Sequence, residues 1–374
     1  MITILHTADW QIGRVFSQFE PDDAAALFEA RFLAVERLAS LATQHDVDAI
    51  LVAGDVFEAQ TVTEKTIRRL FNAMAGFTGP WVLIPGNHDA ALTESVWTQA
   101  QRLHAVPSNV LLCLEPKPVV VAEKFTVLPA PLTQRNTYND LTHWFSTAPR
   151  QDNLLRIGLA HGSVQGILSE DIDSANPIAA GRAEEAGLAY LALGDWHGAK
   201  RIDDRTWYAG TPETDRFKDN DSGQVLLVCI AGQGAPATVT QVPIGRYTWR
   251  QMDWHAAVDA EIDVLVEKLE RIASEDVLQV RVAGTCSLTG HRRLADALAA
   301  TSARARAVVW DTSGLRLEPT EEDMQALHAD GFVGEVLQEL RAEQTGQASE
   351  LARDAILALA RVLDGRRPQT GAGA

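Results

Sequence analysis

The chain has 374 residues, of which 46% are hydrophobic and 22% are charged, and its 33 Lys and Arg residues face 50 Asp and Glu residues. The length exceeds that of one typical domain, and the composition excludes a fibrous, low-complexity or largely disordered protein. The formal net charge of −17 repels a polyanion at long range, so any contact with nucleic acid has to be local, metal-assisted or shared with a partner.

Short apolar runs alternate with helical stretches over the first 243 residues. The runs that predict strands are residues 1–7, 48–54, 81–86, 124–131, 154–162, 188–198, 205–212 and 223–230. Apolar residues at helical spacing predict helices at 24–42 and 62–74. Because helices separate the early strands, the pattern favours an α/β arrangement with a sheet covered on both faces.

Polar side chains follow five of these predicted strands. They are Asp9, Asp55, Asn87 with His88, His161, and Asp195 with His197. Strand ends of an α/β sheet meet at one edge, so we expect these groups to converge on one place. Carboxylate, amide and imidazole groups together are typical of a centre with two metal ions, in which one carboxylate bridges both ions, and Asp55 is the natural bridge.

A second pattern begins near residue 247. It predicts, in order, a strand at 247–254, a helix at 256–273, a strand at 276–284, a helix at 289–301 and a strand at 305–311. This order indicates a small second domain of the α+β class, for which we expect the bounds 246–318.

Residues 319–365 are predicted to be mainly helical. Thr320 and Asp323 have the spacing of a capping box. Apolar residues then recur at helical spacing, at Phe332, Val336, Leu337, Leu340, Leu351, Ile356, Leu359 and Leu363. The pattern fits either a helical pair packed on the second domain or a docking site for a partner helix. The tail at 366–374 has no apolar residue to bury beyond alanine, and we expect it to be disordered.

Cysteine usage and hydropathy indicate the compartment. Cys113, Cys229 and Cys286 lie far apart with no C-x-x-C pair, which argues against a zinc cluster and a disulfide framework. The first residues lack the basic segment and apolar core of a signal peptide, and no apolar run reaches the roughly 18 residues of a membrane span. We therefore expect a cytoplasmic protein without membrane contact.

Five motifs in order, "LHTADWQIG", "GDVFE", "PGNHD", "LAHGSV" and "YAGTPE", resemble those of the calcineurin-like metallophosphoesterases, and within them the SbcD-like nuclease subunits of double-strand-break repair complexes. The resemblance covers residues 1–245 and implies a β-sandwich flanked by helices. Residues 246–318 resemble a DNA-capping domain, and residues 319–365 resemble ATPase-binding helices, in position and length only.

The resemblance also implies a set of site residues. One ion would take Asp9, Gln11, Asp55 and His197, and the other would take Asp55, Asn87, His161 and Asp195. His88 would face the phosphate and assist the leaving oxygen as an acid or charge stabiliser. Asp89, which we predict to be catalytic together with His88, would either orient His88 or pack the loop.

Two positions depart from the family pattern. The usual D-x-H is Asp9-Trp10-Gln11, and the usual G-H-x-H is Gly194-Asp195-Trp196-His197, so each ion loses one imidazole. The more oxygen-rich shell favours Mn²⁺, or Mg²⁺ as the alternative, over Zn²⁺. Gln11 either contributes its amide oxygen or leaves that place to water, and a decayed site that no longer holds the ion is the competing hypothesis.

These expectations combine into one function. The sequence predicts a metal-dependent phosphodiesterase acting on DNA ends in repair, as the nuclease subunit of an SbcCD-type complex with a coiled-coil SbcC-like ATPase, and as a homodimer. Two alternatives stay open, namely a phosphodiesterase for small nucleotides and a catalytically weak scaffold for a partner ATPase. The DNA-binding residues are not predicted.

Overall fold

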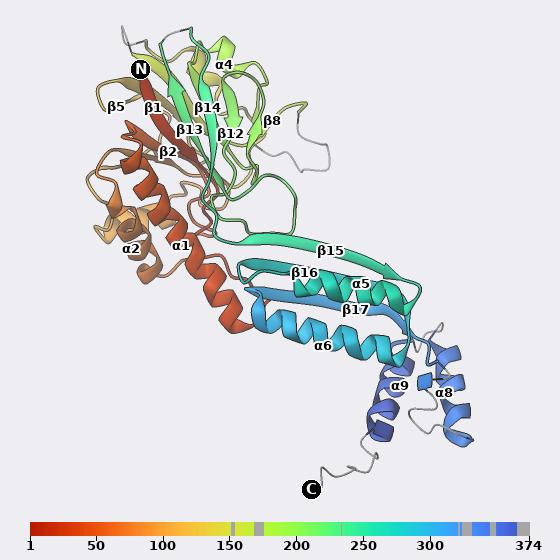
Figure 1. Cartoon of the computed structure of the whole chain (residues 1–374). Coiled ribbons are helices and arrows are strands. Elements are labelled where there is room, and N and C mark those ends of the chain that lie inside the picture. Colours follow the sequence, from red (N-terminus) through yellow and green to blue (C-terminus); the bar gives the residue numbers. More distant parts are fainter. Residues whose placement is uncertain are drawn as a thin grey trace. The chain divides into compact units, whose positions relative to one another are not determined.

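The computed structural model of the chain describes residues 1–150, 154–167, 176–232, 234–320, 322–323, 331–344 and 349–364. The tail at 366–374, predicted to be disordered, lies outside the described residues. The chain divides into two compact units, Met1–Thr248 and Trp249–Ala374 (Figure 1). No helix of the described residues has the length and apolarity needed to cross a membrane.

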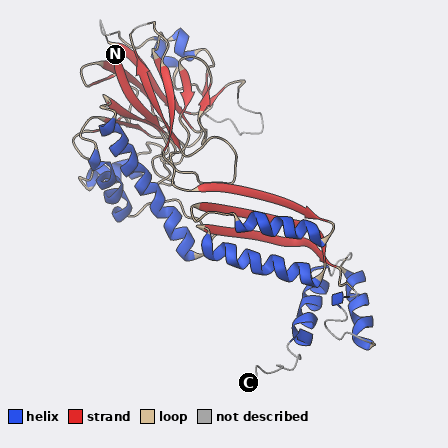
Figure 2. Ribbon diagram, viewed as in Figure 1, coloured by secondary structure: helices blue, strands red, loops and turns tan. Residues whose placement is uncertain are grey.

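The first unit contains two six-stranded sheets (Figure 2). The first sheet has the spatial order β14 (Thr238–Pro243), β13 (Gln224–Ile230), β1 (Ile2–Thr7), β2 (Ala49–Ala53), β3 (Trp81–Ile84) and β4 (Val110–Leu112). Strands β1 to β4 are parallel, whereas β13 and β14 are antiparallel additions at one edge. The register places Thr7 opposite Val52, so β1 and β2 end side by side.

The second sheet provides the other half of the site. Its spatial order is β11 (Lys200–Arg201), β12 (Thr206–Tyr208), β10 (Tyr190–Gly194), β7 (Leu155–His161), β6 (Phe125–Ala130) and β5 (Val119–Val121). The central strands β10, β7 and β6 are parallel, and Gly194 lies opposite His161. A separate pair, β8 (Ser163–Val164) and β9 (Pro177–Ile178), follows β7.

Helices of the first unit lie in its connections. They are α1 (Pro21–Gln44), α2 (Glu64–Ala73), α3 (Val96–Arg102) and α4 (Arg182–Glu185), with the 3₁₀ turns η1 (Met74–Gly76) and η2 (His143–Ser146). Helix α1 begins with Pro21 in its first turn, where the missing N–H costs nothing. The side chain of Thr63 caps α2 by accepting from the Thr66 N–H.

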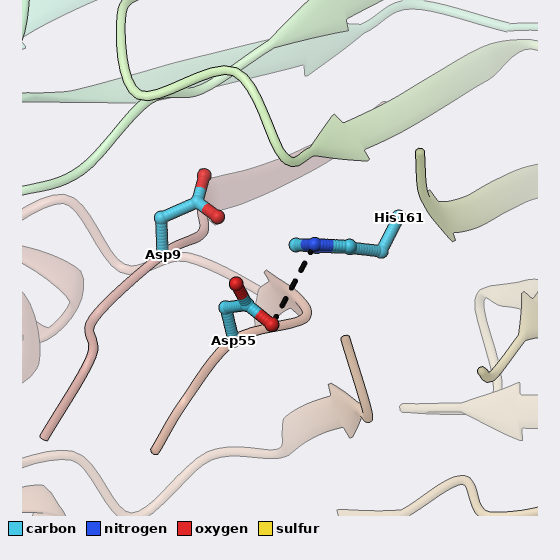
Figure 3. Close-up of side chains that lie close together, drawn as sticks. All are labelled: Asp9, Asp55 and His161. Carbon is cyan, nitrogen blue, oxygen red and sulfur yellow. Dashed lines mark ion pairs between the residues drawn. The ribbon is translucent and has the colours of Figure 1, made fainter. Parts of the chain in front are cut away.

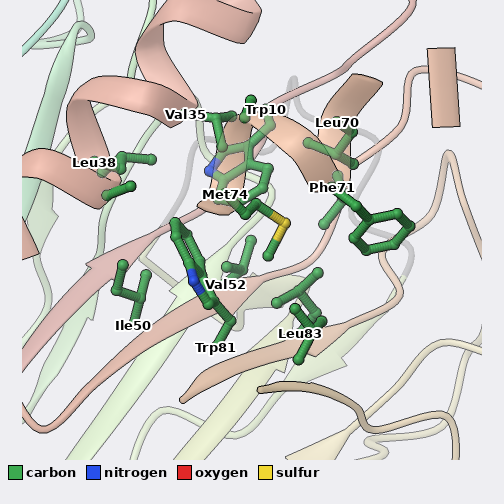
Figure 4. Close-up of a cluster of buried hydrophobic side chains, with 14 of the residues drawn as sticks. Trp10, Val35, Leu38, Ile50, Val52, Leu70, Phe71, Met74, Trp81 and Leu83 are labelled. Carbon is green, nitrogen blue, oxygen red and sulfur yellow. The ribbon is translucent and has the colours of Figure 1, made fainter. Parts of the chain in front are cut away.

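Three apolar layers hold this unit together. Between the sheets, Ile4 and Leu51 of the first sheet pack with Ile157 and Leu159 of the second. The outer face of the first sheet packs against α1, α2 and η1 through the cluster in Figure 4, which includes Trp10, Val35 and Trp81. A third cluster covers the second sheet. The two stacked sheets confirm the β-sandwich that the resemblance implied. The strand–helix pattern alone favoured a single sheet, because strands buried on both faces look alike in either arrangement.

The second unit has the predicted strand–helix order. Its elements are β15 (Thr248–Ala256), α5 (Asp259–Glu270), β16 (Asp276–Cys286), α6 (Leu288–Arg304), β17 (Ala307–Leu317), α8 (Phe332–Glu343) and α9 (Ser349–Asp364). Leu337 of α8 and Ile356 of α9 join the same apolar cluster as Leu278 of β16, so these helices share one core with the three-stranded sheet. Thr320 and Asp323 exchange the two hydrogen bonds of the predicted capping box.

Candidate metal centre

The loops after β1 and β2 turn sharply at the residues that carry the acids. Asp9 and Asp55 have φ angles of 54° and 51°, in the left-handed region that non-glycine residues rarely adopt, and Gln11 follows at 44°. The Asp9 N–H donates to the Gly54 carbonyl and the Gln11 N–H donates to the Asp55 carbonyl, which ties the two loops together. Such strain persists only where surrounding contacts impose it, as at functional sites.

Two glycines of the motifs let the loops approach closely. A Cβ at Gly86 would lie 2.2 Å from Asp55 Oδ1, and a Cβ at Gly194 would lie 2.0 Å from the Ala53 carbonyl oxygen. Any side chain at these positions would displace the acid or the strand end beside it. The glycines of "PGNHD" and "GDWHG" therefore position the site without contributing a ligand atom.

Asp9, Asp55 and His161 converge at the ends of β1, β2 and β7 (Figure 3). One ligand atom from each lies within 4.8 Å of the others, and all three residues are buried. The His161 Nδ1–H donates to the Ala53 carbonyl at 2.8 Å. This bond leaves the Nε2 lone pair directed at the acids, the orientation that a metal-binding histidine requires.

Asn87 and Asp195 complete this side of the centre. The Asn87 amide lies 2.9 Å from His161 Nε2 and 3.0 and 3.2 Å from the two Asp55 carboxylate oxygens. Asp195 Oδ1 lies 3.6 Å from His161 Nε2, and the Asp195 N–H donates to both carboxylate oxygens of Asp9. Five predicted ligands thus lie together around Asp55 and His161, and they include Asp9, which the resemblance assigned to the other ion.

The pKa values of Asp9 and His161 indicate that this position lacks positive charge. Burial raises the pKa of Asp9 to about 6, against the nearby imidazoles. Burial opposes the charge on His161, yet Asp55, Asp195 and Asp9 raise its pKa to about 9. The cluster therefore retains protons to balance its carboxylates, and a divalent cation bound there would supply the same compensation.

The side of Gln11 and His197 is arranged differently. Gln11 Oε1 accepts from Arg14 Nη1 at 2.7 Å, and Gln11 Nε2 lies 3.3 Å from His197 Nε2. His197 Nδ1 lies 3.2 Å from Asp215 Oδ2, and Arg216 Nη2 lies 2.9 and 3.2 Å from the two ring nitrogens. His197 and Gln11 are therefore bonded within a network of arginine and aspartate.

His88 and Asp89 have separate environments. The half-buried His88 donates from Nδ1 to the Glu58 carbonyl at 2.8 Å, and its Nε2 lies 4.0 Å from Asp55 Oδ2. The buried Asp89 accepts from the N–H groups of Gly86 and Phe57, at 2.6 and 3.0 Å. Burial, followed by the repulsion from Asp55, raises the Asp89 pKa to about 7. Of the two roles left open for Asp89, these contacts fit packing of the loop, and the Glu58 carbonyl holds the His88 ring.

Sequence reasoning missed two arginines that organise the site. Arg31 of α1, only 2% exposed, donates to the carbonyl oxygens of Asp9 and Trp10. Its position on the apolar face of α1 could have indicated this role, because a charged residue is rarely buried unless it has bonding partners. Arg14 lies three residues after Gln11 and had no pattern to mark it.

Comparison with known proteins identifies the first unit. The family model described as calcineurin-like phosphoesterase matches residues 2–232. The chain is 37% identical over 93 residues to the SbcD component of the nuclease SbcCD from Rhodobacter capsulatus, an alignment covering 24% of this chain and 22% of that protein. It is 23% identical over 333 residues to the SbcD component from Bacillus subtilis, covering 75% of this chain and 83% of that protein.

A third relative is named as a DNA repair protein. The chain is 22% identical over 281 residues to DNA double-strand break repair protein Mre11 of Methanosarcina acetivorans, covering 73% of this chain and 42% of that protein. The matches to the Rhodobacter and Methanosarcina proteins thus span less than half of those proteins.

Proposed function

We propose that this chain, which belongs to the calcineurin-like phosphoesterase family, is a divalent-metal-dependent phosphodiesterase that cleaves DNA from its ends as the nuclease subunit of an SbcCD-type complex. One observation carries the metal-dependent chemistry. The buried Asp9, Asp55 and His161 offer ligand atoms within 4.8 Å of one another. Asn87 and Asp195 lie against the same position.

The donor set determines which metal we propose. Asp9, Asp55, Asp195 and Asn87 offer oxygen, and only His161 offers nitrogen, a shell that suits Mn²⁺, with Mg²⁺ as the alternative, better than Zn²⁺. A bound ion of this kind lowers the pKa of a water and offsets charge on phosphate oxygens. The sequence pattern favoured two ions, but the groups beside His197 do not fit a second one, because Gln11 Oε1 is engaged by Arg14.

His88 is the residue proposed to assist the leaving group. Its Nδ1–H is held by the Glu58 carbonyl, so a proton on Nε2 makes the ring cationic. In that form the ring both offsets negative charge on the phosphate and donates the Nε2 proton to the leaving oxygen. Asp89 keeps the loop in place by accepting from Gly86 and Phe57, and thus acts as a positioning residue.

The names of the relatives support DNA as the substrate. The SbcD relatives are named as parts of a nuclease, and Mre11 is named a DNA double-strand break repair protein. On this basis we propose an SbcC-like coiled-coil ATPase and a second copy of the chain as partners, in the cytoplasm. Residues 246–318 would form the capping domain and residues 319–365 the ATPase-binding part. Phe332 and Leu351, 78% and 72% exposed on α8 and α9, support the docking role.

Cleavage assays test this function. The purified full chain is stripped with EDTA, supplied with Mn²⁺, Mg²⁺ or Zn²⁺, and given labelled linear duplex, labelled single strands or bis-p-nitrophenyl phosphate. We expect DNA cleavage with Mn²⁺, loss of cleavage in His88→Ala, and unchanged cleavage in His45→Ala, a control at the exposed end of α1. Turnover of the small ester alone would favour a nucleotide phosphodiesterase. No turnover together with tight ATPase binding would favour a scaffold.

A further inference from the structure

We propose that the centre holds a single divalent ion, on the His161 side, and that the guanidinium groups of Arg14 and Arg216 take the place of a second ion. The inference rests on the proposed function for its phosphodiester substrate, but the number of ions can be measured without any substrate. The evidence is the bonding of Gln11 and His197, two of the three residues that the resemblance assigned only to the other ion; the third, Asp9, lies with Asp55 and His161.

Gln11 turns its metal-binding atom towards Arg14. Its amide oxygen, the one atom able to coordinate a cation, accepts from Arg14 Nη1 at 2.7 Å. Its Nε2 carries hydrogen atoms and lies 3.3 Å from His197 Nε2. A cation between Gln11 and His197 would have to break the bond to Arg14 and reverse the amide.

His197 is committed in the same network. His197 Nδ1 lies 3.2 Å from Asp215 Oδ2, and His197 Nε2 lies 3.3 Å from the Gln11 amide nitrogen. The Nε2 side of the ring, where a metal would bind, therefore faces an amide N–H. Arg216 Nη2 lies 2.9 and 3.2 Å from the two ring nitrogens, so an ion bound to His197 would also sit beside a permanent positive charge.

The two arginines are held from several loops. Arg14 Nη1 lies 3.2 Å from Asp215 Oδ2 and 3.6 Å from Glu58 Oε2, in addition to its bond to Gln11. Arg216 Nε lies 3.1 Å from Asp215 Oδ1. Asp215 itself is 1% exposed. One buried carboxylate thus orients both guanidinium groups, a geometry suited to planar recognition of phosphate.

The two departures from the family pattern follow from this arrangement. At 195 the lost imidazole is replaced by a carboxylate, which lies 3.6 Å from His161 Nε2 on the side that keeps its ion. At 11 the lost imidazole is replaced by an amide that binds Arg14 and His197. The side chain of Arg216 is 43% exposed and that of Arg14 is 22% exposed, so both can meet a phosphate oxygen from solvent. The fixed positive charge of the two arginines therefore stabilises negative charge on the phosphate, as a second metal ion would.

The ion count tests the proposal directly. EDTA-stripped full chain is titrated with Mn²⁺, bound metal is measured by elemental analysis, and the electron paramagnetic resonance spectrum is recorded. We expect one Mn²⁺ per chain with the spectrum of an isolated ion. Two ions per chain with an exchange-coupled spectrum, or no bound ion, would overturn the proposal.

A matched pair of variants locates the difference. Gln11→His combined with Arg216→Met restores the family imidazole and removes the adjacent cation, and should raise the count to two ions per chain. Asp195→His restores the other family imidazole on the side that already holds its ion, and should leave the count at one. Two ions in Asp195→His would contradict the assignment of the sides.

A third variant tests the role of the arginine. Arg216→Met should keep one ion per chain and lower kcat/KM roughly 10- to 100-fold, with Arg216→Lys intermediate, as expected for a lost phosphate donor. Unchanged kcat/KM in Arg216→Met would refute that role. If the chain cleaves no phosphodiester but binds one ion, the proposed function fails and the ion count stands. If cleavage requires a second ion, the ion count fails and the function stands.

Discussion

Replacement of Arg31 by methionine should destabilise the first unit strongly, because this arginine joins three loops of the centre. Its donors reach the carbonyl oxygens of Trp10 at 2.6 Å, Asp9 at 3.2 Å and Glu213 at 3.3 Å, and the Thr211 hydroxyl at 3.1 Å. Methionine fills much of the same volume but leaves three carbonyls without these N–H donors. Each buried unsatisfied group costs about 1–3 kcal/mol, and breaking a buried charged network costs about 3–5 kcal/mol in total.

A cost of about 3–5 kcal/mol in a unit of this size corresponds to a fall in Tm of roughly 6–20 °C. Differential scanning calorimetry of Arg31→Met measures it. The matched control is Arg37→Met on the same helix, which removes the half-exposed partner of Glu213. Glu213 keeps its bonds from the Arg246 and Tyr247 N–H groups. The control also removes the bond from Arg37 Nε to the Ile244 carbonyl, and we expect it to lose about 1–2 kcal/mol, less than Arg31→Met. Equal losses in the two variants would refute the structural role of Arg31.

Three further predictions concern the centre and the strand beside it. Burial lowers the pKa of His6 to about 3, so below pH 6.5 the unfolded chain binds a proton that the folded chain does not. Denaturant titrations should therefore show the free energy of unfolding falling by up to ~1.4 kcal/mol per pH unit from about pH 6 towards 3. The fall should be less steep in His6→Gln. Asp89→Ala should lower the free energy of unfolding by about 2–3 kcal/mol, because Asp89 accepts from two buried N–H groups. His88→Ala should change the free energy of unfolding little and lower kcat about 10²- to 10⁴-fold. A loss of stability in His88→Ala and none in Asp89→Ala would contradict these roles. Gly86→Ala should weaken Mn²⁺ binding in calorimetric titrations, because its Cβ would meet Asp55 Oδ1 at 2.2 Å, and unchanged affinity would show that the loop yields without cost.

Much of the metal-binding side could be predicted from the sequence because its residues follow strands directly. Asp9, Asp55 and His161 each lie at the end of an apolar run, and parallel strands bring such ends together. The pattern could not show that two sheets face each other across the site. Strands buried on both faces carry no alternation, so nothing in β6 or β7 distinguishes a second sheet from a continued first one.

The arrangement of Gln11 and His197 could not be predicted, because their contacts are not determined by the spacing of residues in the sequence. The sequence left open whether the Gln11 oxygen binds a metal or leaves the place to water, and in the structure Arg14 occupies that oxygen. Arg216 and Asp215 come from a loop about 200 residues later, in a segment whose mixed charges gave no clear signal. A polar network of this kind is set by side-chain geometry, which residue type alone does not determine.

Anomalous diffraction at the manganese absorption edge, from crystals of the full chain grown with Mn²⁺, locates the bound ions directly. We expect one anomalous peak within ligand distance of Asp9, Asp55 and His161, with Arg14 still bonded to Gln11. Absence of a peak there would contradict the metal centre, and a second peak beside His197 would contradict the single-ion arrangement.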